Sequence, residues 1–135
     1  MEILHQGFKV LVVDDEVDAA DSLAALFALT HHDTRTAYGG EHALQVAMTF
    51  EPAVVFLDIN MPRMDGYATA AALRLMFPTG PPILIAFSGQ AQQSDIAGAV
   101  KTAFDLYVNK PCDFETLLHL LDKAISHHAV TGAAR

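Results

Sequence analysis

Residues 9–16 read KVLVVDDE, an unbroken apolar run that ends in three acidic residues. Two more continuous apolar runs follow, AVVFL at 53–57 and ILIAF at 83–87, and a weaker run, LYV, lies at 106–108. Continuous rather than alternating runs of this length are typical of parallel strands that are covered on both faces. A fifth, weaker run at 34–37 fits an edge strand. The sequence therefore predicts five strands.

Helices are expected between and after these strands. Apolar residues recur with the spacing of an amphipathic helix at 20–27, 96–103 and 114–125, and shorter helices are expected at 44–48 and 65–76. Asp113 and Glu115 are placed to cap and charge the last helix at its N-terminus. This alternation predicts an α/β fold with a parallel sheet, right-handed crossovers and helices on both faces.

The length and composition favour one globular domain. We expect a single domain over 1–135, with a core at about 9–125 and a short tail at 126–135. Apolar residues make up 52% and charged residues 18%, which excludes intrinsic disorder. No run approaches the ~18 apolar residues of a membrane span, and the N-terminus has no signal-peptide pattern. The single cysteine, Cys112, cannot form an internal disulfide, so we expect a reduced, cytoplasmic protein.

The charge balance constrains the partners. Eight Lys and Arg residues against sixteen Asp and Glu residues give a net charge of −8. Nucleic acid and anionic membrane surfaces would be repelled by this charge, so we expect neither as a partner. A cation that is bound by carboxylates fits the charge better.

Polar residues with matching chemistry follow the predicted strands. Asp14 and Asp15 come after the first strand, Asp58 after the third, Ser88 after the fourth and Lys110 after the fifth. The carboxyl ends of parallel strands lie at one edge of the sheet, where ligands bind in such folds. Crowded carboxylates favour a bound cation, and Mg²⁺ takes carboxylate oxygens while leaving positions for phosphate oxygens. The lysine ammonium and the serine hydroxyl could then contact a phosphoryl group.

Four motifs in this order resemble a known family. They are VVDDE at 12–16, LDINMPRMDG at 57–66, FSG at 87–89 and YVNKP at 107–111. The chain is similar, over about Lys9–Ile125, to the receiver domains of bacterial two-component response regulators. The resemblance implies a flavodoxin-like doubly wound (βα)5 fold whose five parallel strands have the order 2-1-3-4-5. It also implies a histidine kinase or a histidine phosphotransfer protein as the phosphodonor.

The resemblance implies a role for each residue at the strand ends. Asp58 is expected to be the phosphoacceptor and Lys110 to pair with the phosphoryl group. Mg²⁺ is expected to be held by Asp15 directly, by Asp14 directly or through water, by Asp58 and by the backbone carbonyl of Asn60.

Two residues, Ser88 and Tyr107, would form the switch implied by the resemblance, and Pro111 carries a separate expectation. The Ser88 hydroxyl would move toward the phosphoryl group, and Tyr107 would enter the space that it leaves. The bond between Lys110 and Pro111 would be cis, which costs far less before proline than elsewhere.

Phosphoryl transfer to Asp58 makes clear physical demands. The Asp58 carboxylate must be ionised to attack the phosphorus of a phosphohistidine and give an acyl phosphate. Attacker and donor are both negative, so Mg²⁺ and Lys110 must screen the charge on the transferring oxygens. We expect Lys110 and the metal to keep the pKa of Asp58 low, although Asp14 and Asp15 raise it.

The alternatives to a stand-alone regulator are a receiver of a hybrid kinase, a phosphohydrolase and a flavin- or nucleotide-binding domain. The segments 17–23 and 104–111 look most like receivers of hybrid sensor kinases, whereas Met1 and the ten-residue tail favour a complete chain without an effector domain. An aspartate-nucleophile phosphohydrolase would need an acid two residues after Asp58, where Asn60 cannot donate a proton. A flavin- or nucleotide-binding domain would need a phosphate loop after the first strand, where the residues are acidic.

A few positions carry weaker expectations. Ala103 stands where the family often has glycine, which predicts a looser helix end, and Gln90 would flank the path of attacking water. His31 and His32 are expected to be solvated rather than metal ligands. Met61 could either line a partner surface or pack on its own domain.

Overall fold

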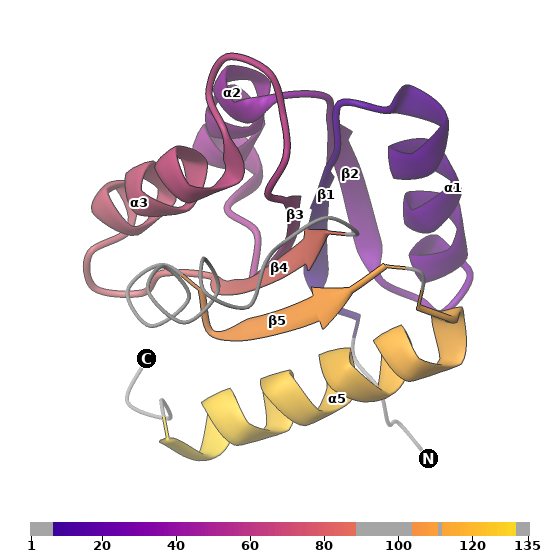
Figure 1. Cartoon of the computed structure of the whole chain (residues 1–135). Coiled ribbons are helices and arrows are strands. Elements are labelled where there is room, and N and C mark those ends of the chain that lie inside the picture. The colour runs from indigo at the N-terminus through magenta and orange to yellow at the C-terminus, as the bar shows by residue number, and fades with distance from the viewer. Residues whose placement is uncertain (1–6, 89–103, 111, 132–135) are drawn as a thin grey trace.

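A five-stranded parallel sheet forms the centre of the molecule (Figure 1). The computed structural model describes residues 7–88, 104–110 and 112–131. The strands are β1 (Lys9–Val13), β2 (Asp33–Ala37), β3 (Val54–Asp58), β4 (Ile83–Ser88) and β5 (Leu106–Asn109). Their order is β2-β1-β3-β4-β5, and every neighbouring pair is parallel. The predicted strands, their parallel pairing and their order are confirmed, including the edge position of β2.

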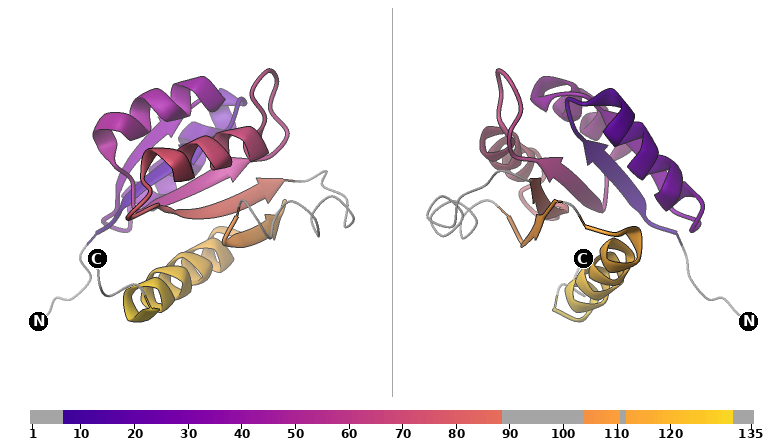
Figure 2. Two further views of the ribbon diagram at one scale, coloured as in Figure 1. Left: turned by 90° about the vertical axis from the view of Figure 1, so that its left-hand side faces the viewer. Right: turned by 45° about the vertical axis from the view of Figure 1, so that its right-hand side comes forward.

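Helices cover both faces of the sheet (Figures 1 and 2). They are α1 (Val17–Ala28), α2 (Gly40–Phe50), α3 (Gly66–Met76) and α5 (Phe114–Thr131). Side chains of α2 and α3 pack on one face, and side chains of α1 and α5 pack on the other. The helix predicted at 96–103, together with Ala103, lies outside the described residues.

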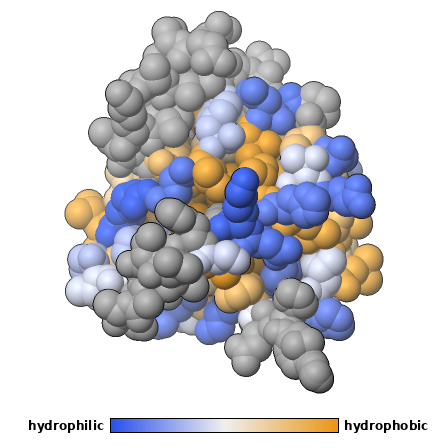
Figure 3. Space-filling model, turned by 90° about the horizontal axis from the view of Figure 1, so that it is seen from below, coloured by the Kyte–Doolittle hydropathy of each residue, from blue (hydrophilic) through white to orange (hydrophobic). Residues whose placement is uncertain are grey.

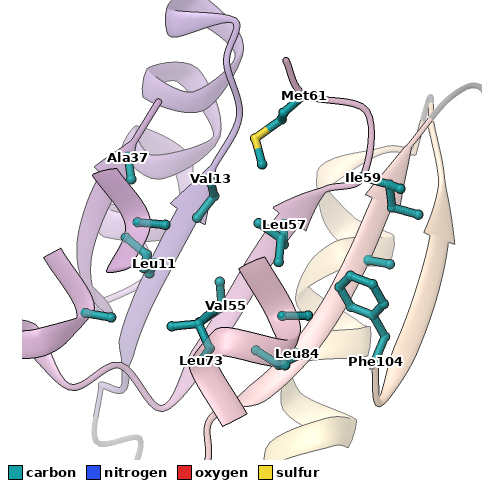
Figure 4. Close-up of a cluster of buried hydrophobic side chains, with 14 residues drawn as sticks. Leu11, Val13, Ala37, Val55, Leu57, Ile59, Met61, Leu73, Leu84 and Phe104 are labelled. Carbon is teal, nitrogen blue, oxygen red and sulfur yellow. The ribbon is translucent and has the colours of Figure 1, made fainter. Parts of the chain in front are cut away.

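Successive residues of the inner strands β1, β3 and β4 alternate between two separate hydrophobic clusters. Leu11, Val55 and Leu84 belong to a cluster under α2 and α3 (Figure 4). Val12 and Phe56 belong to a second cluster under α1 and α5. Because both faces of each inner strand are buried, the strand sequences are continuously apolar. Burying one such side chain contributes roughly 1.5–3 kcal/mol relative to leaving it exposed.

Aspartate side chains cap the N-termini of two helices. The Asp65 carboxylate accepts a hydrogen bond from the Ala68 N–H at 2.9 Å, so α3 begins at Gly66. The Asp113 carboxylate accepts one from the Thr116 N–H at 2.8 Å, which confirms the predicted cap of α5. Hydrogen bonds from Thr116 also lower the pKa of Asp113.

The structure corrects one expectation and decides another. His32 is half-buried rather than solvated, because its Nδ1 accepts the Phe8 N–H at 3.1 Å and its ring stacks on the Phe8 ring. This histidine ties the start of the first strand to the turn before the second, while His31 is exposed as predicted. Met61 is buried in the cluster under α2 and α3, so it packs on its own domain.

Hydrophilic and hydrophobic side chains are interspersed on the face of the molecule that is seen from below (Figure 3). Within the described residues, no helix has both the length and the apolar character needed to cross a membrane.

Candidate functional site

Strands β1, β3 and β5 bring two carboxylates and an ammonium together at one edge of the sheet. Lys110 Nζ lies 3.0 Å from Asp14 Oδ2 and 3.7 Å from Asp58 Oδ2. Carboxylate oxygens of Asp14, Asp15 and Asp58 all lie within 4.8 Å of one another. The sequence predicted this convergence from the rule that parallel strands end at the same edge.

The two buried carboxylates are held in the same way. Asp14 and Asp58 are 5% and 8% exposed, whereas Asp15 is exposed to solvent. Asp14 Oδ1 accepts the N–H of Glu16 at 3.0 Å, and Asp58 Oδ1 accepts the N–H of Asn60 at 3.0 Å. In each case the backbone two residues further on fixes one oxygen, and the other oxygen faces the lysine. Both acids are therefore oriented before any ligand arrives.

Burial dominates the acidity of Asp58. The pKa of Asp58 is raised from 3.8 to about 6, and the largest cause is desolvation by burial. The charge of Asp14 also raises this pKa. The charge of Lys110 lowers it, but by less than the other two causes raise it. Lys110 and a metal together were expected to keep this pKa low, an expectation that left burial out of account. Lys110 alone does not achieve this.

Lys110 is held in its charged form. Burial disfavours the ammonium, but the hydrogen bond to Asp14 and the charges of Asp58 and Asp14 outweigh burial and raise the pKa of Lys110. One ammonium compensates only one of the three neighbouring carboxylates when all are ionised. The remaining negative charge and the oxygen-only donor set suit a hard divalent cation such as Mg²⁺.

The residues expected to form the switch are placed less completely. Tyr107 is half-buried and packs against the cluster under α2 and α3. Its hydroxyl is buried without a hydrogen-bond partner among the described residues, and burial raises its pKa. Ser88 ends β4, where its backbone pairs with Asn109. Gln90 and Pro111, including the predicted cis bond, lie outside the described residues.

Two residues near the site were assigned no role from the sequence. A Cβ atom on Gly66 would lie 2.6 Å from the Ile59 Cα and 2.7 Å from the Asp58 carbonyl oxygen. Glycine therefore lets α3 begin directly against the backbone of the acidic strand end. Phe87 places its ring centroid 5.0 Å from Lys110 Nζ. The sequence signals were a glycine at the start of a helix and an aromatic residue near the end of a strand.

The fold and the acidic edge agree with the comparison to protein families. The family model described as the response regulator receiver domain matches residues 10–122. This chain belongs to the response regulator receiver family. Within the receiver, the acidic site lies at the carboxyl ends of the strands, as in other doubly wound folds.

Relatives of the receiver include larger regulatory proteins. It is 34% identical over 131 residues to the transcriptional regulatory protein ZraR of Salmonella typhimurium, and this match covers 97% of the receiver but 29% of ZraR. It is 35% identical over 103 residues to the transcriptional regulatory protein PrrA of Mycobacterium tuberculosis, covering 76% of this chain and 43% of PrrA. The receiver thus spans less than half the length of these relatives.

Solved structures share the same architecture. The receiver domain of NtrX from Brucella abortus is 30% identical, with a TM-score of 0.77, and the match covers 87% of this chain and 98% of that one. A two-component response regulator from Clostridium difficile has a TM-score of 0.81 at 20% identity, covering 88% and 96% of the two chains. The second likeness shows the fold alone.

Proposed function

We propose that this receiver takes a phosphoryl group onto Asp58 from a phosphohistidine of a histidine kinase or a histidine phosphotransfer protein. The observation that carries the proposal is the convergence of three carboxylates and one lysine within a few ångströms. Asp58 is the natural acceptor, because it is buried at the end of the central strand β3 and its Oδ2, the oxygen opposite the one that the Asn60 N–H binds, faces Lys110.

The proposed transfer forms one bond and breaks one. An Asp58 carboxylate oxygen bonds to phosphorus as the P–N bond of the phosphohistidine breaks, and the electron pair stays on the imidazole, which takes up a proton. The backbone N–H of Asn60 holds the other Asp58 oxygen during the attack. The Lys110 ammonium, 3.7 Å from Asp58, screens the charge on the transferring oxygens.

Mg²⁺ is part of the proposal. Asp14, Asp15 and Asp58 would hold the ion, with the backbone carbonyl of Asn60 as a further ligand. When bound, the ion supplies positive charge that lowers the pKa of Asp58 and stabilises the developing negative charge.

We propose a switch rather than a turnover enzyme. A phosphohydrolase would need an acid near the acyl phosphate to protonate a leaving group, and the residue two positions after Asp58 is Asn60. The buried Tyr107 hydroxyl has no hydrogen-bond partner among the residues that the structure describes, and a native buried hydroxyl normally has one, which supports a second arrangement of the strand β5 region. Ser88 and Tyr107 would couple phosphorylation to that change.

The wider setting is proposed on chemical grounds. The net charge of −8 argues against direct nucleic-acid or membrane binding by this receiver. We propose one receiver domain over 1–135, acting in the cytoplasm, where kinases that use ATP form the phosphohistidine. A stand-alone regulator and a receiver within a hybrid kinase are both compatible with this chemistry.

The decisive experiment measures the intact mass of the purified chain after incubation with Mg²⁺ and phosphoramidate. We expect a gain of one phosphoryl group that is lost with EDTA and in the variant Asp58→Asn. The variant Asp122→Asn, which changes an exposed acid of α5, is the matched control and should be modified like the unchanged protein. No mass gain in the unchanged protein, or an equal gain in Asp58→Asn, would overturn the proposal.

A further inference from the structure

The ammonium of Lys110 has an aromatic neighbour as well as two acidic ones. Its Nζ lies over the ring of Phe87, 5.0 Å from the ring centroid. A cation within ~6 Å of the centroid and over the ring face is attracted by the negative charge of the π system. The same Nζ is 3.0 Å from Asp14 Oδ2 and 3.7 Å from Asp58 Oδ2, so two carboxylates and one ring surround the ammonium.

The register of the sheet explains this contact. Lys110 follows β5, whereas Asp58 ends β3, and β4 lies between these strands. Backbone pairing sets Phe87 beside Asp58 on one side and beside Val108 on the other. Paired residues of neighbouring strands face the same side of a sheet, and residues two apart share that face. The lysine side chain therefore crosses the end of β4 on the face from which the Phe87 ring projects.

The ring is itself held in place. Phe87 is half-buried and packs against the cluster under α1 and α5. The lysine side chain is 28% exposed and long, with many rotamers to lose when it is ordered. A ring fixed by the core can restrict such a side chain without adding a charge to the site.

We infer that Phe87 is a positioning residue for the reaction proposed above, and that its ring holds the Lys110 ammonium between Asp14 and Asp58. The hydrogen bond to Asp14 is directional and draws the ammonium to one side. Attraction to a ring face is much less directional. The ammonium can therefore shift toward a new charge at Asp58 and still be attracted to the Phe87 ring. This inference depends on the proposed function, since it assigns the ring a role in phosphoryl transfer.

The contact is measured directly by NMR on the unchanged protein. A proton above a ring face is shielded, so the Hε resonances of Lys110 should lie upfield of those of Lys123, an exposed lysine of α5. The upfield shift should disappear in Phe87→Leu and persist in Phe87→Tyr. Equal Hε shifts for the two lysines in the unchanged protein would overturn the inference.

The role in the reaction is measured by a double-mutant cycle. In the presence of Mg²⁺, Phe87→Leu should slow phosphorylation by phosphoramidate about two- to fivefold, and Phe87→Tyr should restore the rate. In a Lys110→Met background, Phe87→Leu should have no further effect. Phe114→Leu, which removes a half-buried ring that packs on Phe27 in the same cluster, controls for lost core packing.

A second substitution keeps the test valid if Phe87→Leu does not fold. Trifluorophenylalanine placed at position 87 alone keeps the ring shape but removes negative charge from its face, so the same slowing is expected. An equal slowing by Phe87→Leu with and without Lys110, or an equal slowing by Phe114→Leu, would show a structural role only and overturn the inference. Failure of the unchanged protein to be phosphorylated would instead overturn the proposed function, and the positioning role with it.

Discussion

The buried carboxyl group of Asp58 opposes folding when it is ionised. Its carboxyl group is 8% exposed, and burial raises its pKa to about 6. The folded protein therefore binds the Asp58 proton more tightly than the unfolded chain, in which the pKa is near 3.8. The stabilising contribution of this group is complete below about pH 4 and is lost as the pH rises through about 6. Near neutral pH without metal, the ionised group destabilises the fold.

Removing this charge should stabilise the metal-free protein. Asp58→Asn is expected to increase the free energy of unfolding in EDTA near neutral pH by up to about 3 kcal/mol, and by much less near pH 4. Urea unfolding at both pH values measures the difference, with the exposed Asp122→Asn as the matched control. An increase of the same size at both pH values would show that the charge of Asp58 is not its cause.

At the scale of elements, the start of α3 is shaped around the end of β3. Gly66 lies against the Asp58 carbonyl oxygen, and its N–H donates to the Ile59 carbonyl oxygen at 3.0 Å. The helix thereby fixes the loop between Asp58 and Gly66, which carries Asn60. Small changes at this junction should therefore shift the backbone of Asp58.

A methyl group at this junction should therefore be costly. Gly66→Ala places a Cβ atom 2.6 Å from the Ile59 Cα, where the backbone must shift, so we expect a loss of about 1–3 kcal/mol in the free energy of unfolding. We also expect slower phosphorylation, because the Asp58 backbone moves. Gly80→Ala is the matched control, since nothing lies within 4 Å of its added Cβ. Equal effects of the two substitutions in urea unfolding would contradict this account.

At the scale of the whole molecule, a metal ion bound at the acidic site would couple binding to the stability of the fold. Strands β1 and β3 and the loops that follow them must be assembled before the carboxylates of Asp14, Asp15 and Asp58 meet. A cation that binds only this arrangement stabilises the folded state by mass action. The excess of acidic over basic residues in the whole chain favours the same outcome.

Mg²⁺ should therefore raise the thermal midpoint of unfolding. At a concentration about 100 times its dissociation constant, the ion should add about 2.7 kcal/mol to the free energy of unfolding. Thermal unfolding across a Mg²⁺ titration measures this effect, and Asp14→Asn should reduce it strongly. Asp21→Asn, which changes an exposed acid of α1, is the control for a general charge effect. A midpoint that does not depend on Mg²⁺ in the unchanged protein would contradict the metal site.

The sequence by itself determined much of this protein. Apolar periodicity marked the strands and the described helices, Asp113 marked a helix start, and polar residues after successive strands marked one edge of the sheet. These features are local, or follow from the general rule that parallel strands end together, so a pattern along the chain is enough to predict them.

Only the tertiary structure decided the features that depend on contacts across the fold. The raised pKa of Asp58 follows from burial by neighbouring strands, and the contact between Phe87 and Lys110 follows from the register of β3, β4 and β5. His32 was misjudged because its partner, Phe8, is separated from it by the whole of α1. Burial and register are properties of the assembled sheet, and no single segment of the chain contains them.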